Sequence, residues 1–461
     1  MSMYAKLKLR AANGNPARVG LIGAGKFGSM FLSQAWRTPG VHLVGVSDLS
    51  PARAQESMRR VGWPDSRFDS NSLEQAARTA TTFVTDDTLA MIASPFIDIV
   101  IDATGSPAAG IRHVLAACEH RKHIIMVNVE ADALAGPLLA RRAAEAGIIY
   151  SMASGDQPAL IAELVDWARV IGLDVICAGK GTKYLPVYHQ STPDTVWGHY
   201  GFSEEQVAGG DFNPQMFNSF LDGTKSALEM AAVANACDLA PPDDGLAFPP
   251  CGVDDLPNLL RPIEDGGILA KRGTVEVVSS LERDGRPVFR DLRWGVYAVF
   301  DAPTKYVRDC FEQYGLKTDS SGRYAAMYKP YHLIGLELGT SVASIATRGE
   351  PTGSTTDWRG DVIAVSKRAL NPGDTLDGEG GFMVFGKVVP AETSLALGAV
   401  PIGLAHGMTL RHAVPANRPV KWTDVNCDTT AQAIAFRLEM EALFRSEKAI
   451  GKVATPQLVT A

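Results

Sequence analysis

The sequence predicts an α/β protein whose N-terminal domain is a doubly wound parallel sheet. The first observation is a short apolar run, residues 19–22, that leads directly into Gly23-x-Gly25-x-x-Gly28. The second is that three further apolar runs follow, with segments of helical character among them. Strands that alternate with helices and begin with a glycine turn are typical of this fold. We expect an α+β domain and a small, mostly β domain to follow.

The glycine turn has the spacing of a Rossmann dinucleotide-binding turn. Gly23 would turn the chain sharply, Gly25 would let the backbone approach a pyrophosphate, and Gly28 would let the next helix pack closely on the strand. That helix, with Lys26 and Phe27 in its first turn, would present free N–H groups and its positive dipole end to the phosphates. We predict these five residues as cofactor-binding. The alternative is a structural glycine turn in an α/β domain without a cofactor.

The ends of the next predicted strands carry polar residues suited to the same ligand. These strands are residues 42–47, 97–101 and 123–127. An acid after the second strand is expected to bind the adenosine ribose hydroxyls, and Asp48 stands there. Glu130 could bind the cofactor ribose or take part in catalysis, and both roles stay open. The cofactor-binding residues predicted at these strand ends are Asp48, Thr104, Gly105, Asn128 and Glu130.

Bulk properties exclude several classes of function. The net charge of -7 argues against a general nucleic-acid or anionic-membrane partner. No signal peptide and no run of about 18 apolar residues is recognisable. The six cysteines are scattered without metal spacing, which favours reduced thiols and predicts no metal site. We therefore expect a cytoplasmic protein that acts on a small-molecule substrate.

A chain of 461 residues is too long for one core. We predict a Rossmann domain over residues 1–155 and a substrate-binding, catalytic domain over residues 156–355. Gly, Pro, Ser and Thr then cluster in a linker near residues 348–359. Short strands, turns and a final helix at about residues 429–444 predict a third domain over residues 356–461.

A predicted helix over residues 218–237 carries the leading catalytic candidates. Lys225 and Glu229 are four residues apart and share a face, and Asp222 lies at the start of this segment. The rest is apolar and small, so we expect a buried helix whose charges need partners or a cleft. Lys225 could polarise a carbonyl or relay a proton, with Asp222 or Glu229 setting its charge. The alternative is a surface ion pair on a helix edge.

Two further segments are candidates for substrate contact. Lys183, with Lys180 before it, follows a predicted strand and could bind an anionic group of the substrate, although such a loop can also be an ordinary solvated turn. We include Lys183 among the catalytic candidates. Residues 186–213 are rich in aromatic side chains, and we expect this segment to line or cover the substrate pocket.

Several motifs occur together along most of the chain: Ile101-Asp-Ala-Thr-Gly105, Asn128-Val-Glu-Ala-Asp132, Ala178-Gly-Lys-Gly181, Asp222-Gly-Thr-Lys225 and Pro330-Tyr-His-Leu333. With the glycine turn, they resemble homoserine-dehydrogenase-like NAD(P)-dependent oxidoreductases that carry a C-terminal SAF domain. That family includes the second type of 1-deoxy-D-xylulose 5-phosphate reductoisomerase. The resemblance implies that Asp222 and Lys225 act on a substrate hydroxyl, that residues 361–425 form the SAF module, and that the protein is a dimer or larger homo-oligomer, such as a tetramer.

The nature of the cofactor depends on Asp48. A carboxylate there would repel the 2′-phosphate of NADP, so NAD is the preferred cofactor and NADP a possible one. The leading hypothesis is hydride transfer between nicotinamide and a polyol, hydroxy acid or sugar-phosphate type of substrate. One alternative is an NADPH-dependent 1-deoxy-D-xylulose 5-phosphate reductoisomerase. Another is a non-catalytic carbohydrate-binding or assembly protein that acts through the SAF domain.

Overall fold

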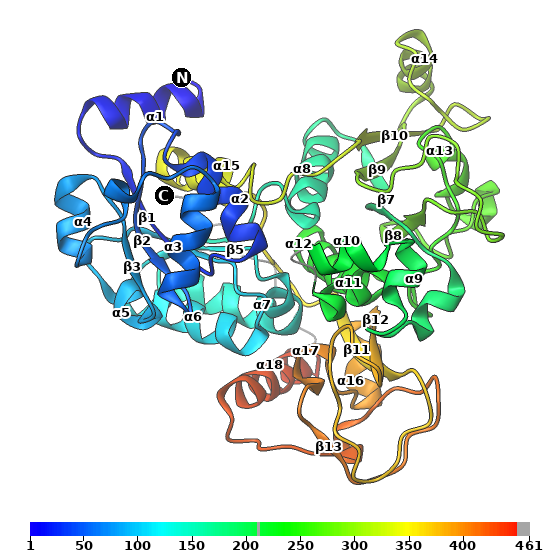
Figure 1. Ribbon diagram of the computed structural model, residues 1–461. Helices are drawn as coiled ribbons and strands as arrows, with labels where there is room; N and C mark the ends of the chain where they lie inside the picture. Colours follow the sequence, from blue (N-terminus) through cyan, green and yellow to red (C-terminus); the bar gives the residue numbers. More distant parts are fainter. Residues whose placement is uncertain (210–212, 450–461) are drawn as a thin grey trace. The chain divides into compact units, whose positions relative to one another are not determined.

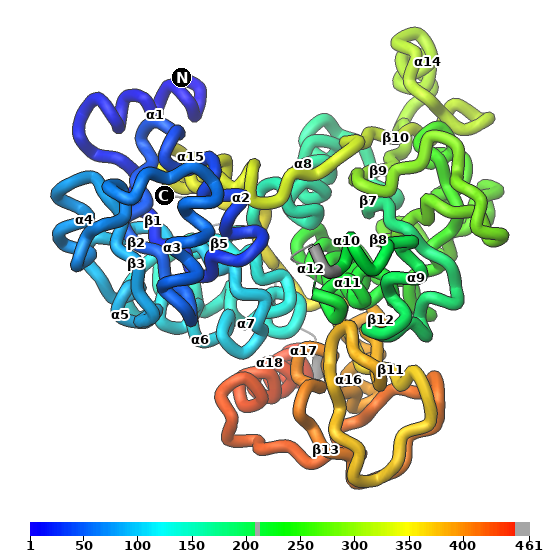
Figure 2. Tube along the Cα trace, viewed as in Figure 1, coloured from blue at the N-terminus to red at the C-terminus, as the bar shows by residue number. Residues whose placement is uncertain are grey.

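The computed structural model describes residues 1–209 and 213–449 (Figures 1 and 2). The chain forms two compact units, and each is made of two separate stretches of sequence. The first unit contains Met1–Glu163 and His332–Ser354. The second contains Leu164–Tyr331 and the chain from Thr355 onward.

These units divide the chain differently from the three predicted domains. Residues 332–354, which the prediction assigned to the second domain, belong to the first unit. The stretch predicted as a third domain lies in the same unit as most of the second. Both differences come from packing between segments that are distant in sequence, which composition along the chain does not reveal.

The first unit is built on a six-stranded sheet with the order β3-β2-β1-β4-β5-β6. Every neighbouring pair is parallel. The order reverses between β1 and β4, so a ligand is expected at the carboxyl ends of these strands. The predicted doubly wound sheet is confirmed. Its strands are β1 (Ala17–Ile22), β2 (Val41–Ser47), β3 (Phe83–Thr85), β4 (Ile99–Asp102), β5 (His123–Met126) and β6 (Tyr150–Met152).

Local signals explain where the helices of this unit begin. Ser50 and Ser106 each accept a backbone N–H at a helix start, and a proline follows each serine. Asn128 caps α7 in the same way, with its side chain accepting the N–H of Ala131. The helices are α1 (Met3–Ala12), α2 (Lys26–Ala35), α3 (Pro51–Arg60), α4 (Leu73–Thr79), α5 (Thr88–Ala93), α6 (Pro107–Glu119), α7 (Val129–Glu145) and α15 (Gly339–Arg348), while α8 (Gln157–Val170) spans the boundary between the units.

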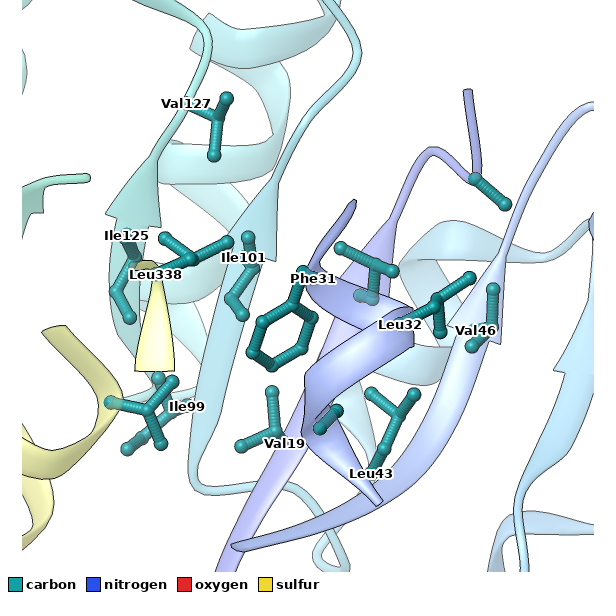
Figure 3. Close-up of a cluster of buried hydrophobic side chains, with 14 of the residues drawn as sticks. Val19, Phe31, Leu32, Leu43, Val46, Ile99, Ile101, Ile125, Val127 and Leu338 are labelled. Carbon is teal, nitrogen blue, oxygen red and sulfur yellow. The ribbon is translucent and has the colours of Figure 1, made fainter. Parts of the chain in front are cut away.

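The returning stretch completes the core of the first unit. Leu338, Val342 and Ile345 belong to the same buried cluster as Ile101 and Ile125 of the sheet. Figure 3 shows Leu338 beside these strands. Burying side chains of this size contributes about 1.5–3 kcal/mol each, so these contacts stabilise the packing of residues 332–354 on the first unit.

The second unit contains a mixed four-stranded sheet with the order β10-β9-β7-β8. β8 runs parallel to β7, whereas β9 is antiparallel to both β7 and β10. The strands are β7 (Asp174–Thr182), β8 (Thr274–Ser279), β9 (Val296–Asp301) and β10 (Tyr324–Lys329). The helices from this part of the chain are α9 (Val196–Tyr200), α10 (Glu204–Gly209), α11 (Pro214–Leu221), α12 (Thr224–Cys237), α13 (Leu256–Leu259) and α14 (Lys305–Gln313).

The C-terminal stretch adds two small antiparallel pairs, β11 with β12 and β13 with β14. Arg437 of α18 is buried and pairs with Asp361 of β11 and, at 3.0 Å, with Glu441. This ion cluster anchors the last helix to the hairpin. The elements are β11 (Gly360–Ser366), β12 (Val384–Pro390), α16 (Ala391–Leu397), α17 (Ile402–Ala405), β13 (Thr409–Leu410), β14 (Val425–Asn426) and α18 (Gln432–Ala449).

Helix α12 is central to the second unit because it packs against β7 and β8 and also against β11 and β12. The sequence predicted one helix over residues 218–237, but the structure divides it into α11 and α12. Gly223 adopts a φ of +90° at the break, a conformation that glycine allows. The carboxylate of Asp222 accepts the N–H of Thr224 at 2.9 Å there. The expectation that this helix is buried is confirmed.

Among the helices within residues 1–209 and 213–449, none has both the length and the apolar character needed to cross a bilayer.

Candidate dinucleotide and catalytic sites

The glycine turn connects β1 to α2. Its three glycines differ in how much space a side chain would have at each position. Gly23 has a φ of +91°, and a Cβ on it would lie 2.8 Å from the carbonyl oxygen of Ala103. A Cβ on Gly28 would lie 2.1 Å from the carbonyl oxygen of Gly23. A Cβ on Gly25, by contrast, would meet no atom of the described chain within 4 Å. Packing therefore accounts for Gly23 and Gly28, while Gly25 leaves open space at the start of the helix.

The first turn of α2 fits a phosphate group. Gly25 is its N-cap residue, and no side chain of the described chain caps the helix. The first N–H groups of a helix have no partner within it, and they carry the positive end of the dipole. Lys26 is exposed beside them. Phe27 packs against the core cluster, so its main chain, and not its ring, is the group available to a cofactor.

Asp48 follows β2 directly and is tied to the glycine turn. Its Oδ2 accepts the N–H of Ala24 at 2.9 Å, and its Oδ1 accepts the N–H of Ser50 at 3.0 Å. These bonds orient the carboxylate, and each oxygen keeps a lone pair for a further donor. The arrangement fits the two ribose hydroxyls of an adenosine.

The ends of β4 and β5 contribute one exposed segment and one buried one. Thr104 and Gly105 are exposed. Asn128 is fully buried, and its Nδ2 donates to the carbonyl oxygen of Ser106 at 2.8 Å and to Oγ1 of Thr104 at 3.1 Å. Because these bonds occupy its amide, Asn128 positions the loop after β4. Glu130 is buried in the first turn of α7.

The predicted cofactor residues thus gather at one edge of the sheet, because their strands are parallel neighbours. The residues present fit a dinucleotide: space at Gly25, an uncapped helix start and an oriented carboxylate at Asp48.

The acids of the catalytic candidate helix have buried lysine partners. Asp222 pairs with Lys367 at 2.8 Å, and Glu229 pairs with Lys180 of β7. All four side chains are nearly inaccessible to solvent. Burial raises the pKa of Asp222 above its ordinary value, and the charge of Lys367 opposes the rise. These ion pairs explain how carboxylates are tolerated on a buried helix.

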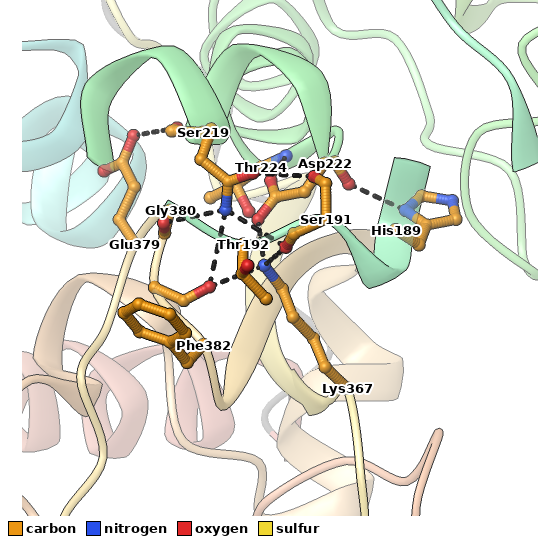
Figure 4. A network of polar contacts seen from close by, with 12 residues as sticks. His189, Ser191, Thr192, Ser219, Asp222, Thr224, Lys367, Glu379, Gly380 and Phe382 are labelled. Atoms are coloured by element: carbon orange, nitrogen blue, oxygen red, sulfur yellow. Dashed lines mark hydrogen bonds and ion pairs between the residues drawn. The ribbon is translucent and has the colours of Figure 1, made fainter. Parts of the chain in front are cut away.

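Lys367 comes from the C-terminal stretch and binds more than Asp222 (Figure 4). Its Nζ also donates to the carbonyl oxygens of Ser191 and Gly381, at 2.7 Å each. Asn218 of α11 donates to the same loop, at 2.8 Å to the carbonyl oxygen of Gly380. The network therefore joins the start of α12 to two loops that are remote in sequence.

The structure gives Asp222 and Glu229 different charge partners from the one expected. The prediction paired them with Lys225, but their ion pairs are with Lys367 and Lys180. Lys225 is half-buried on the same face of α12 as Glu229. It remains the predicted catalytic lysine.

Lys183 directly follows β7 in a partly buried position. Its Nζ donates to the carbonyl oxygen of His199 at 2.6 Å and lies 5.4 Å from the centre of the Tyr200 ring. Burial lowers the pKa of Lys183, and the charge of Arg293 lowers it further. A lysine with a lowered pKa suits proton transfer, so Lys183 stays among the candidates.

The aromatic segment after β7 packs largely against itself. Tyr188, Val196 and Leu221 form a buried cluster, with Trp197 and Tyr200 packed against it. Its predicted role at the substrate pocket stays a prediction, and residues 210–212 lie outside the described residues.

His189 is a half-buried group that the sequence did not reveal. Its Nδ1 lies 2.7 Å from the carbonyl oxygen of Asp222, and its Nε2 lies 3.0 Å from the hydroxyl of Tyr184. A carbonyl only accepts, so Nδ1 carries the proton, and in the neutral ring Nε2 accepts from the Tyr184 hydroxyl. Burial lowers the pKa of His189, which agrees with this neutral form.

Glu276 of β8 is the second group that sequence reasoning missed. Its carboxylate accepts the N–H groups of Ala247 at 3.1 Å, Phe248 at 3.3 Å and Val277 at 2.8 Å. Burial raises the pKa of Glu276 to about 7. The carboxylate ties the loop at residues 247–248 to the sheet. A glutamate within the otherwise largely apolar run of residues 274–278 was the one available signal, since its partners are main-chain groups.

The described residues contain no group of three or more His, Cys, Asp or Glu side chains placed to bind a metal ion.

Two family models match consecutive parts of the chain. Residues 17–126 match an oxidoreductase family with an NAD-binding Rossmann fold. Residues 155–338 match the catalytic domain of oxidoreductase DRL. The chain is a Rossmann oxidoreductase with a DRL catalytic domain. Both matches end at or before residue 338, so the SAF module stays a prediction.

Solved structures similar to this oxidoreductase have low identity and low TM-scores. An NAD-binding oxidoreductase from Klebsiella pneumoniae is 13% identical, with 75% of this chain and 72% of that chain covered and a TM-score of 0.32. A homoserine dehydrogenase from Thiobacillus denitrificans is 17% identical, with 48% and 49% covered and a TM-score of 0.35. A 1-deoxy-D-xylulose 5-phosphate reductoisomerase from Zymomonas mobilis is 17% identical, with 48% and 57% covered and a TM-score of 0.33. No curated protein matches the chain.

Replacing Gly25 with alanine tests where the cofactor lies. The added methyl group meets open space in the free protein, so Gly25→Ala should leave the melting temperature nearly unchanged. It should weaken NAD binding at least tenfold, about 1.4 kcal/mol, because the pyrophosphate would contact that methyl group. Gly28→Ala is the contrast, and should lower the melting temperature. Calorimetric titration and thermal unfolding measure both. Unchanged NAD affinity in Gly25→Ala would contradict this placement.

The raised pKa of Glu276 predicts a specific pH dependence of stability. Between its ordinary value of 4.5 and about 7, the folded protein retains a proton that the unfolded chain has lost. This contribution to the free energy of unfolding therefore falls by about 3 kcal/mol as pH rises through that window. Glu276→Gln should remove the decline, whereas Glu264→Gln, at an exposed position, should keep it. Urea unfolding at pH 5 and pH 7.5 compares the variants, and the same decline in Glu276→Gln would contradict the prediction.

Proposed function

We propose that this oxidoreductase transfers a hydride between NAD and a carbinol or carbonyl carbon of a small polar substrate of the polyol, hydroxy acid or sugar-phosphate type. The observation that supports it most is the carboxylate of Asp48, which two main-chain N–H groups orient beside the glycine turn. When bound, NAD supplies the hydride acceptor or donor. We further propose a cytoplasmic homo-oligomer, as the family resemblance implies.

In this proposal, residues of the first unit bind the cofactor and residues of the second unit act on the substrate. Gly25 and the start of α2 bind the diphosphate, and Asp48 binds the adenosine ribose. In the catalytic unit, Lys225 assists the substrate oxygen by holding or moving its proton. Asp222 and Glu229, neutralised by Lys367 and Lys180, position the helix that carries Lys225.

Two alternatives make different predictions. An NADPH-dependent 1-deoxy-D-xylulose 5-phosphate reductoisomerase would bind a 2′-phosphate dianion, which the charge of Asp48 opposes. A non-catalytic carbohydrate-binding or assembly protein, acting through a SAF module at residues 361–425, would not need a glycine turn with space for a diphosphate. A screen of hydroxy acids, polyols and their phosphates with NAD and NADP, followed by nicotinamide absorbance, separates the three.

The first functional prediction concerns cofactor choice. The wild-type protein should bind NAD at least tenfold more tightly than NADP, because the Asp48 carboxylate repels the 2′-phosphate. Asp48→Asn removes the charge and should reduce this ratio about tenfold. Asp87→Asn is the matched control, since Asp87 also accepts a main-chain N–H at an exposed helix start of the same unit. A wild-type preference for NADP would reject NAD as the cofactor.

The second functional prediction concerns Lys225, the proposed acid–base group. Lys225→Met keeps the alkyl stem and removes the ammonium, so turnover should fall by about 10²–10⁴-fold, the usual contribution of an acid–base group. The dissociation constant for NAD should not change. Lys305→Met, at an exposed position on α14, should leave both quantities unchanged. Full turnover in Lys225→Met on the substrate found in the screen would exclude Lys225 from the chemistry.

A further inference from the structure

A pocket of about 210 Å³ lies within the second unit, beside the start of α12. Drug-sized ligands occupy pockets of about 300–1,000 Å³, so this one suits a compact molecule. Its walls come from four segments: the 186–190 turn, α12, the loop before β8, and β12. The lining residues that carry the argument are His189, Gly223, Ala227, Phe248, Phe385 and Lys387.

The pocket lies on the opposite face of α12 from the proposed catalytic lysine. Gly223 and Ala227 are four residues apart and face the pocket. Lys225 and Glu229 are also four apart but are offset from them by two positions, a rotation of about 200°. Glu229 accordingly pairs with Lys180 of β7, which is on the sheet side of the helix. The pocket is therefore separate from the surface that presents Lys225.

One wall of the pocket holds a strained residue. Phe248 has a φ of 50°, a rare conformation for a bulky side chain that persists only when its surroundings enforce it. Its N–H donates to Glu276, and its ring stacks on Tyr184 with centroids 4.0 Å apart. His189 stacks on Phe385 with ring centroids 4.7 Å apart, and its ring also meets Phe248 edge to face at 6.1 Å. Phe248 is thus held by two residues outside the pocket lining, Tyr184 and Glu276, while Phe385 stacks on another lining residue.

The charges at the pocket favour an anion. Lys387 is half-buried in its wall, and no described residue forms a hydrogen bond or ion pair with its ammonium. The N-terminal end of α12, with Gly223 at the pocket, adds a positive dipole end. Asp244 is the one acid in the lining, and it is exposed, where solvent screens its charge. Burial lowers the pKa of His189, which favours its neutral form.

We propose that this pocket is a second ligand site, which binds a small organic anion with a ring-sized apolar body. The apolar body lies between Phe248 and Phe385, and the anionic group pairs with Lys387. This site is independent of the hydride-transfer reaction, because it lies on the other face of α12. Its occupant would contact the start of the helix that carries Lys225.

Phenylacetate is a suitable probe, and phenylacetamide is its neutral analogue of nearly the same shape. Calorimetric titration of the full-length protein should show millimolar or tighter binding of phenylacetate and at least tenfold weaker binding of the amide. Lys387→Met should weaken phenylacetate binding at least tenfold. Lys317→Met, which removes an exposed lysine elsewhere in the unit, should not.

Two further measurements separate this site from the catalytic one. Phenylacetate affinity should be the same in Lys225→Met and in the presence of saturating NAD. The proposal is overturned if wild-type protein does not bind phenylacetate, if the amide binds equally well, or if Lys225→Met abolishes binding. These experiments measure binding and not turnover. A failure of the second-site proposal is therefore distinguishable from a failure of the proposed reaction.

Discussion

The second unit depends on the buried ion pair between Lys367 and Asp222. Removing one member of such a pair leaves an uncompensated charge in the interior, typically at a cost of 3–5 kcal/mol. Asp222 stands where α11 meets α12, and Lys367 follows β11. The pair therefore couples the C-terminal hairpin to the helix that carries the proposed catalytic lysine. The C-terminal stretch is part of the catalytic unit's interior, whatever else it binds.

Helix α12 separates the face that carries Lys225 and Glu229 from the face that lines the pocket, because strands pack against both of its sides. Lys180 of β7 neutralises Glu229 on one side, and β12 supplies Phe385 and Lys387 on the other. Small residues such as Ala227 and Ala231 let the strands approach the helix closely. A helix packed in this way is held rigidly, and rigid support is what a catalytic lysine needs.

The parts of the fold that the sequence predicted are those controlled by local pattern. The glycine turn and the apolar runs after it identified the parallel sheet, and the acid after the second strand predicted a carboxylate near that turn, where Asp48 accepts the N–H of Ala24. The pairing of Asp222 with Lys367 could not be predicted, because no periodicity links residues so far apart. The same holds for Leu338, whose place in the first core depends on a chain that returns after the whole mixed sheet. His189 and Glu276 act on main-chain groups, which leave no trace in residue type.

The return of residues 332–354 to the Rossmann unit affects how the protein is made. During translation the sheet of β1 to β6 emerges early, but the patch that Leu338, Val342 and Ile345 cover stays open until the ribosome has added nearly two hundred more residues. Synthesis at about 5–20 residues per second makes that an interval of roughly ten to forty seconds. A nascent chain in that interval exposes apolar surface, so it is the stage at which chaperones would be needed most.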